Sequence, residues 1–139
     1  MRLDLAARAY LGVPFMHQGR NPSVGLDCIG LIVCAGLDGG YAFPAFDSTS
    51  YGRDPAHGLL EGHLLAALGP ALPVSDRRAG DIAAIAYAGA VRHVGVIGDH
   101  PQGHSLIHTN TAVGRVTEAR IDQKWSGRIV AIYRPEPIE

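Results

Sequence analysis

A change of hydrophobic period near residue 70 constrains the fold of this 139-residue chain more than any other feature of its sequence. Before that point, apolar residues recur at helical spacing in residues 3–11, 28–37 and 59–68. After it, short apolar runs separated by Gly, Asp or Pro indicate strands. The five strand candidates are residues 82–87, 93–98, 105–109, 113–119 and 128–134. This order predicts an α+β domain in which N-terminal helices pack on a five- to six-stranded antiparallel sheet.

The chain is long enough to form one domain around its own core. A folded chain of this length buries roughly 68% of the surface that its unfolded form exposes, so disulfide or metal staples are not needed. No internal repeat or linker divides the sequence, which we interpret as a single domain over residues 1–139. The segment from Tyr41 to Pro55 is rich in aromatic residues, Ser, Thr and Pro, and is expected to run over the surface, where it could line a cleft.

The charge balance argues against two classes of partner. The chain has 12 basic and 13 acidic side chains and one lysine, Lys124, whereas nucleic-acid and anionic-membrane binders need a surplus of basic residues. No apolar run reaches the roughly 18 residues of a membrane span. Arg2, Asp4 and Arg8 interrupt the segment where a signal peptide would be apolar. We therefore expect a protein made in the cytoplasm without a signal peptide and without a membrane span.

Cys28 has the position expected of a nucleophilic cysteine. Asp27 is a suitable N-cap, so Cys28 falls in the first turn of the second helix, where free backbone N–H groups and the helix dipole favour a thiolate. The same N–H groups can stabilise an oxyanion on an attacked carbonyl. Cys34 would lie about 9 Å along the helix, which is too far for a disulfide. Taken alone, Cys28 has an equally weighted alternative as a buried core cysteine.

Two of the seven histidines can act with this cysteine. Residues 98–103 are typical of a turn between strands at 93–97 and 104–108. A hairpin symmetric about that turn sets His93 directly opposite His108 on one face, with Cβ atoms roughly 4.5–5.5 Å apart. His93 can then accept the thiol proton while His108 holds its tautomer and orientation. A register slip of one residue would place the two rings on opposite faces.

Other polar residues have weaker claims on the site. His17 and Gln18 lie on the loop before the cysteine and could contact substrate or donate to an oxyanion. Arg92 and Arg115 could hold substrate carboxylates, although solvated surface arginines are the alternative interpretation. Asp27 is better explained as the helix cap than as a catalytic carboxylate, because its charge would raise the pKa of the neighbouring thiol.

Five segments, in this order along the chain, resemble the NlpC/P60-type cysteine peptidases of bacterial cell-wall metabolism. They are Gly12-Val13-Pro14-Phe15, Leu26-Asp27-Cys28-Ile29-Gly30-Leu31, Ala79-Gly80-Asp81-Ile82, Arg92-His93-Val94-Gly95-Val96 and Leu106-Ile107-His108. The similarity extends from about Leu5 to Arg134. It implies a papain-like fold that needs neither cofactor nor metal. It also implies that Cys28 is the nucleophile, His93 the base and His108 the third polar residue.

Two positions depart from the family pattern. Phe15 stands where the family usually has a tyrosine whose hydroxyl lies near the reacting centre, and Ile29 stands where a serine usually follows the nucleophile. Phenylalanine cannot donate that hydrogen bond, and loss of one oxyanion donor can cost on the order of 100-fold in turnover. We expect these changes to affect the rate and the oxyanion arrangement more than the reaction class.

The resemblance implies a cysteine amidohydrolase that forms a thioacyl intermediate. Its implied substrate is a peptidoglycan stem peptide, cleaved at or near a γ-D-glutamyl–diaminopimelate bond. The segment from Gly12 to Gln18, ahead of Gly25-Leu26-Asp27-Cys28, is similar to the tail-tip peptidases of phages and gene transfer agents. That similarity implies tail-tip, hub or baseplate proteins as partners, and a phage-like particle that carries the enzyme to the periplasm or cell wall.

Three alternatives stay open at this point. The fold could serve as an inactive structural adaptor in a tail tip, although such a plug has no need of Cys28, His93 and His108 together. One thiolate and two imidazoles can also bind zinc. Related folds transfer acyl groups instead of hydrolysing them.

Overall fold

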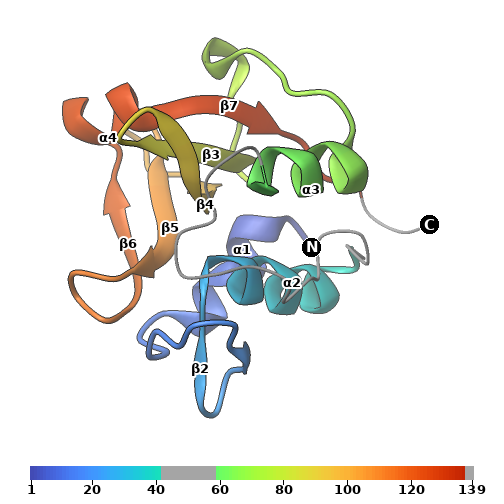
Figure 1. Cartoon of the computed structure of the whole chain (residues 1–139), viewed down its shortest axis with the longest axis vertical. Coiled ribbons are helices and arrows are strands. Elements are labelled where there is room, and N and C mark those ends of the chain that lie inside the picture. The colour runs from blue at the N-terminus through green and yellow to red at the C-terminus, as the bar shows by residue number, and fades with distance from the viewer. Residues whose placement is uncertain (42–58, 137–139) are drawn as a thin grey trace.

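The computed structural model describes residues 1–41 and 59–136, and it has the predicted α+β architecture (Figure 1). The N-terminal part contains α1 (Leu3–Ala7), the 3-10 helix η1 (Arg8–Tyr10), β1 (Arg20–Asn21), β2 (Gly25–Leu26), α2 (Cys28–Gly39) and α3 (Leu59–Leu68). The C-terminal part contains the 3-10 helix η2 (Val74–Asp76), β3 (Ile82–Tyr87), β4 (Ala90–Gly98), β5 (Ser105–Asn110), β6 (Arg115–Arg120), α4 (Gln123–Arg128) and β7 (Ile129–Tyr133). Apart from Tyr41, the segment expected to line a cleft falls outside the described residues.

Five strands form one antiparallel sheet in the order β6-β5-β4-β3-β7, as the fold prediction requires. Each predicted strand coincides with one of them, with small differences at the ends. The short hairpin of β1 and β2 was not predicted from the sequence; it lies within the loop that precedes Cys28. Helix α4 was not predicted either, because six residues that include a glycine are too few to establish a helical apolar period.

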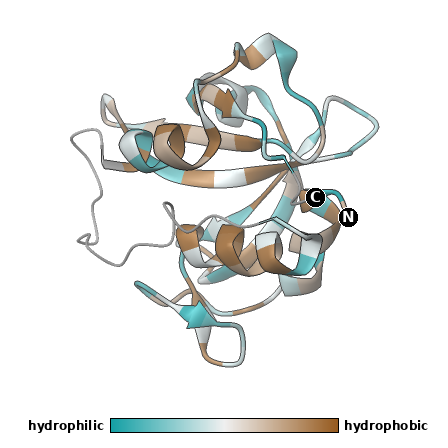
Figure 2. Ribbon diagram, turned by 90° about the vertical axis from the view of Figure 1, so that its right-hand side faces the viewer, coloured by the Kyte–Doolittle hydropathy of each residue, from teal (hydrophilic) through white to brown (hydrophobic). Residues whose placement is uncertain are grey.

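A hydrophobic cluster lies on each face of the sheet. Figure 2 shows apolar residues on the helices and on the strands, and the buried ones among the described residues form these two clusters. Helices α1, α2 and α3 cover the face that carries Val94 and Val96 of β4. The opposite face carries Ile97 of the same strand, and Trp125 of α4 packs against its cluster. The side chains of β4 therefore divide between two cores.

The Asp27 carboxylate fixes the start of α2, as the sequence predicts. Its Oδ1 atom accepts a hydrogen bond from the Gly30 N–H group at 2.8 Å, and its Oδ2 atom accepts one from the Gln18 N–H group at 2.9 Å. Arg20 Nη1 lies 2.9 Å from Oδ1. The helix ends where Gly40 adopts a positive φ of 86°, a conformation that favours glycine. The Asp27 cap and its ion pair with Arg20 together fix the position of Cys28 in the first turn of α2.

Asp81 makes a second buried junction, at the start of β3. Its side chain is 2% exposed and accepts hydrogen bonds from Arg134 Nε at 2.9 Å and Arg134 Nη2 at 3.0 Å. The Arg78 N–H group donates to the same carboxylate at 2.7 Å. This carboxylate thereby ties the chain after β7 to the chain before β3.

Replacing Asp81 with alanine is expected to lower the free energy of unfolding by about 1–3 kcal/mol, because it leaves partly buried donors without their acceptor. Asp81→Asn keeps an acceptor oxygen and should lose less. Urea unfolding followed by circular dichroism measures both variants. A loss below about 1 kcal/mol in Asp81→Ala would contradict this role of the carboxylate.

Candidate active site

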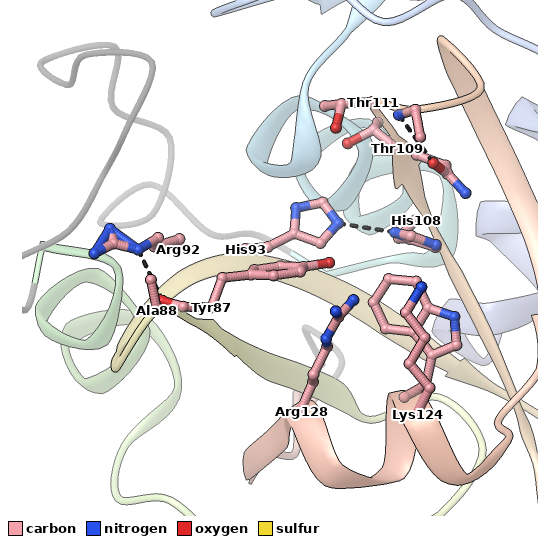
Figure 3. A pocket seen from close by; sticks show the side chains of 12 residues that line it. Tyr87, Ala88, Arg92, His93, His108, Thr109, Thr111, Lys124 and Arg128 are labelled. Carbon is pink, nitrogen blue, oxygen red and sulfur yellow. Dashed lines mark hydrogen bonds between the residues drawn. The ribbon is translucent and has the colours of Figure 1, made fainter.

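His93 of β4 and His108 of β5 form a hydrogen-bonded pair (Figure 3). His93 Nε2 lies 2.9 Å from His108 Nδ1, and the two ring centroids are 5.1 Å apart. The predicted meeting of the two imidazoles is therefore confirmed as a geometric fact. Since Nε2 of His93 is engaged with His108, its Nδ1 is the nitrogen that remains for a thiol.

The predicted register of this hairpin is wrong by two residues. The Cα partners are Val96 with Ile107, Ile97 with Leu106 and Gly98 with Ser105, so one step further along the strands places Gly95 opposite His108. The reason lies in the turn. His104 was predicted to begin the strand, but it adopts a positive φ of 76° and its N–H group bonds to the His100 carbonyl within the turn.

A shift of two residues keeps His93 and His108 on the same face, because side chains alternate with a period of two. The rings consequently meet on a diagonal, and Gly95 leaves room for this arrangement. A Cβ atom at Gly95 would lie 3.2 Å from His108 Cβ and 2.7 Å from Leu106 Cδ1. The glycine that the sequence places two residues after His93 is therefore part of how the imidazole pair forms.

The Cys28 sulfur lies next to the strand that carries His93. The backbone N–H group of Val94, the residue after His93, lies near this sulfur and lowers the pKa of the thiol, as do the N–H groups of Ile29 and Cys28. Within the described part of the chain, no hydrogen bond joins the Cys28 sulfur to His93 itself. Transfer of the thiol proton from Cys28 to His93 therefore requires these two side chains to move closer together. Such catalytic hydrogen bonds often shorten only when substrate binds.

A pocket of about 780 Å³ opens on the histidine pair. Its walls come from three segments: the end of β3 with the start of β4, the end of β5 with the following turn, and α4 (Figure 3). The charged side chains among its described lining residues are Arg92, Lys124 and Arg128. The pocket is therefore suited to an anionic ligand.

No protein-family model matches the sequence, and no curated protein matches it either. Several solved structures do. The NlpC/p60 domain of the peptidoglycan hydrolase SagA aligns with a TM-score of 0.61 and 22% identity, over 94% of this chain and 95% of that one. An NlpC/P60 family protein from Bacillus cereus aligns with a TM-score of 0.70 and 21% identity, over 98% of this chain and 40% of that one.

A third neighbour, the peptidoglycan hydrolase RipB of Mycobacterium tuberculosis, aligns with a TM-score of 0.58 and 18% identity, over 96% of this chain and 62% of that one. The chain has the NlpC/P60 fold. The predicted fold class is thereby confirmed. The NlpC/P60 fold accounts for nearly the whole chain but for less than half of the longer Bacillus cereus protein.

Burial sets the protonation state of the site. It raises the pKa of the Cys28 thiol to about 12, and the Asp27 carboxylate adds to this rise, while the three backbone N–H donors oppose it. Burial lowers the pKa of His93 to about 3, with a further contribution from His108, and lowers the pKa of His108 to about 4. The expectation that the helix dipole holds Cys28 as a thiolate is therefore wrong for the resting structure. At neutral pH the thiol and both imidazoles are uncharged.

The structure separates the weaker site candidates. Arg92 lines the pocket, and its Nε atom donates to the Tyr87 carbonyl at 2.8 Å. Phe15, His17 and Gln18 do not line it. They lie on the loop before α2, where the Phe15 N–H group bonds to the Gly114 carbonyl of the turn between β5 and β6. Their proposed contacts with substrate stay predictions.

Two further candidates have other roles or positions. Three donors occupy the Asp27 carboxylate, which is 4% exposed, so its role is the helix cap and not substrate binding. Arg115 is exposed on β6 and is not a lining residue of the pocket.

Helix α4 supplies pocket residues that the sequence analysis did not single out. The Trp125 ring packs edge-on against His108, with centroids 4.8 Å apart, and against Tyr87, with centroids 6.4 Å apart. The available signal was Asp122, an N-cap whose carboxylate accepts a hydrogen bond from the Trp125 N–H group at 2.9 Å. An N-cap three residues before the only tryptophan marks a helix start even where no apolar period follows.

The zinc alternative finds no support in this geometry. Over residues 1–41 and 59–136, no three side chains of His, Cys, Asp or Glu are placed to hold a metal ion together. Cys28, His93 and His108 consequently do not form a metal-ligand group. No helix in these two ranges has both the length and the apolar character needed to cross a membrane.

The raised thiol pKa predicts slow alkylation of Cys28 by iodoacetamide at pH 7, because the thiolate is the reactive form. We expect the rate to increase about tenfold per pH unit from about pH 7 to pH 10. Mass spectrometry of the Cys34→Ser variant follows Cys28 alone. Fast modification at pH 7 that does not increase at higher pH would contradict a neutral resting thiol.

The lowered histidine pKa values predict that acid destabilises the fold. Between about pH 6.5 and the folded values of about 3 and 4, the unfolded chain binds more protons than the folded one. The free energy of unfolding should therefore fall as the pH falls from about 6.5, by at most about 1.4 kcal/mol per pH unit for each histidine. Above about pH 6.5 the two residues should contribute no such change.

Urea unfolding of the wild type, His93→Gln and His108→Gln between pH 7 and pH 5 measures this dependence. Each variant should lose less stability on acidification than the wild type, because it lacks one buried neutral imidazole. The same pH dependence in all three proteins would show that these residues are not the cause.

Proposed function

We propose that this chain is a cysteine peptidase that cleaves peptidoglycan stem peptides. The observation that carries the proposal is the His93–His108 hydrogen bond, made from the strand whose Val94 N–H group lies near the Cys28 sulfur. A base oriented by a second imidazole and placed near a thiol is the arrangement that nucleophilic catalysis by cysteine needs. The description of the structural neighbours SagA and RipB as peptidoglycan hydrolases supports the substrate class.

The reaction begins with a neutral pair. As the Cys28 sulfur attacks the peptide carbonyl, His93 Nδ1 takes the thiol proton, and the carbonyl π electrons move to the oxygen. Backbone N–H groups at the start of α2 stabilise the oxyanion that forms. His93 then donates its proton to the departing amine, which leaves a thioacyl intermediate. His93 next removes a proton from water, and the attack of that water breaks the carbon–sulfur bond and releases the acid. His93 returns this proton to the departing Cys28 sulfur, which restores the neutral pair.

His108 acts through His93. To leave Nδ1 of His93 free to accept the thiol proton, Nε2 of His93 must carry the hydrogen and donate it to His108 Nδ1. This bond holds the ring orientation during both proton transfers, and it stabilises the imidazolium that forms on His93. Trp125 in turn packs against His108 and limits its movement.

The finer parts of the proposal rest on sequence resemblance. The bond at or near γ-D-glutamyl–diaminopimelate is the one that the NlpC/P60 resemblance implies. The Gly12 to Gln18 segment supports a tail-tip component of a phage-like particle, which binds hub or baseplate proteins and opens the cell wall for DNA delivery. In this view the protein is made in the bacterial cytoplasm and acts in the periplasm or cell wall. Phe15 and Ile29, which depart from the family pattern, favour an inactive tail-tip adaptor as the alternative.

Digestion of purified sacculi, with mass analysis of the released muropeptides, tests the activity, the nucleophile and the bond together. The wild type should release stem-peptide fragments, and Cys28→Ala should release none. Cys34→Ala is the matched control, because it removes the other thiol of the same helix and should retain activity.

Equal fragment release by the wild type and Cys28→Ala would overturn the assignment of the nucleophile. No release by a folded wild-type protein, together with an unreactive Cys28 thiol at high pH, would support the structural adaptor. A product in which the acyl group is joined to a new amine would indicate acyl transfer.

A further inference from the structure

Lys124 and Arg128 lie on the pocket side of α4, next to two aromatic rings (Figure 3). The Arg128 guanidinium carbon is 4.7 Å from the Tyr87 ring centroid and 5.5 Å from that of Trp125. Lys124 Nζ is 6.0 Å from the Trp125 centroid. We call these four residues the α4 basic wall.

The cations of the α4 basic wall have no acidic partner among the described residues. The ion pairs that the structure describes elsewhere join arginines to Asp4, Asp27, Asp81, Asp99 and Glu118. None of them includes Lys124 or Arg128, and no described residue that lines the pocket is Asp or Glu. Asp122, the nearest acid along the helix, is used as the cap. Two positive charges therefore face the pocket without a carboxylate from the described part of the chain.

The aromatic rings hold Arg128 ready for a ligand. Arginine stacks on aromatic faces and still presents N–H groups in a planar fork, which matches the two oxygens of a carboxylate. A side chain that is already held loses less conformational entropy when it binds. Lysine adds a compact charge on a mobile stem. Together they form a site for one carboxylate group.

The α4 basic wall adjoins the histidine pair directly. Trp125 packs on His108 at 4.8 Å between centroids, and His108 bonds to His93. Cys28 itself is not a lining residue of the pocket, so an anion bound at the wall would lie on the histidine side of the reacting groups. Free carboxylates that flank a scissile bond are a feature of stem peptides, and amidation converts them to neutral carboxamides.

We propose that Lys124 and Arg128 bind a free carboxylate next to the scissile bond of the peptide, so that the protein discriminates against amidated stem peptides. This proposal rests on the proposed peptidase function, whose site it extends. The discrimination comes from the charge-assisted hydrogen bonds that a carboxylate accepts and a carboxamide accepts only weakly.

Cleavage of three synthetic stem peptides tests the proposal. One peptide has free carboxylates, one is amidated at the D-glutamyl α-carboxyl, and one at the α-carboxyl of diaminopimelate. For the wild type, one of the two amidations should lower kcat/KM by about tenfold or more. Arg128→Gln should lower kcat/KM for the free peptide to about the level of that amidated peptide, and should leave the amidated peptide little changed.

Lys124→Gln should give a smaller effect in the same direction, and Arg128→Lys an intermediate one. Arg120→Gln is the matched control, because Arg120 is exposed on β6 and does not line this pocket. It should behave as the wild type on all three peptides. Circular dichroism and thermal unfolding check that each variant is folded.

Binding separates this proposal from the peptidase proposal. Trp125 is the only tryptophan of the chain and belongs to the wall, so its fluorescence reports occupation of the pocket. Titration of the Cys28→Ala variant with the same peptides should show weaker binding of one amidated form than of the free peptide. In the double variant Cys28→Ala/Arg128→Gln, the two peptides should bind with equal affinity.

The outcomes are distinguishable. If no peptide is cleaved but the free peptide binds more tightly through Arg128, the peptidase function fails and the carboxylate site stands. If all three peptides are cleaved and bound alike, or if Arg128→Gln retains the wild-type preference, the carboxylate site is overturned while the peptidase function stands.

Discussion

The site depends above all on one buried carboxylate, that of Asp27. It joins the first turn of α2 through Gly30, the preceding loop through Gln18, and the β1 strand through Arg20. A helix N-terminus needs acceptors for its free N–H groups, and a buried acceptor that serves three segments fixes their relative positions. The sulfur of Cys28 is held where this junction puts it, beside the strand that carries His93.

The same carboxylate has a chemical consequence. Its negative charge adds to the effect of burial and opposes ionisation of Cys28, while burial keeps both histidines neutral. The helix dipole and the backbone donors work in the opposite direction but do not prevail. Such a site suits a reaction in which the thiol proton moves to His93 as the sulfur attacks the carbonyl. Charge then appears on the reacting groups only after the substrate has excluded water from the site.

The two sides of the site therefore differ in character. On the cysteine side the Asp27 carboxylate is satisfied within the protein, by the Gly30 and Gln18 N–H groups and by Arg20. On the α4 side, the Trp125 ring packs on His108, and Trp125 and Tyr87 position cations that form no ion pair within the described part of the chain. The first side provides the reacting groups and the second the contacts that select a ligand. This division explains how a chain with a net charge of −1 can present a basic pocket.

Local rules in the sequence determined the helix start at Cys28, the five strands and the face shared by His93 and His108, because caps, turns and alternation act between near neighbours. Only the tertiary structure decided the diagonal meeting of the imidazoles, since it depends on a turn in which His104 adopts a positive φ and on the space left by Gly95. Burial likewise decided the protonation states, because desolvation depends on residues distant in sequence. The α4 basic wall could not be predicted from the sequence either, because a six-residue helix is too short to show an apolar period. Only the packing of α4 against the sheet brings Trp125 to His108.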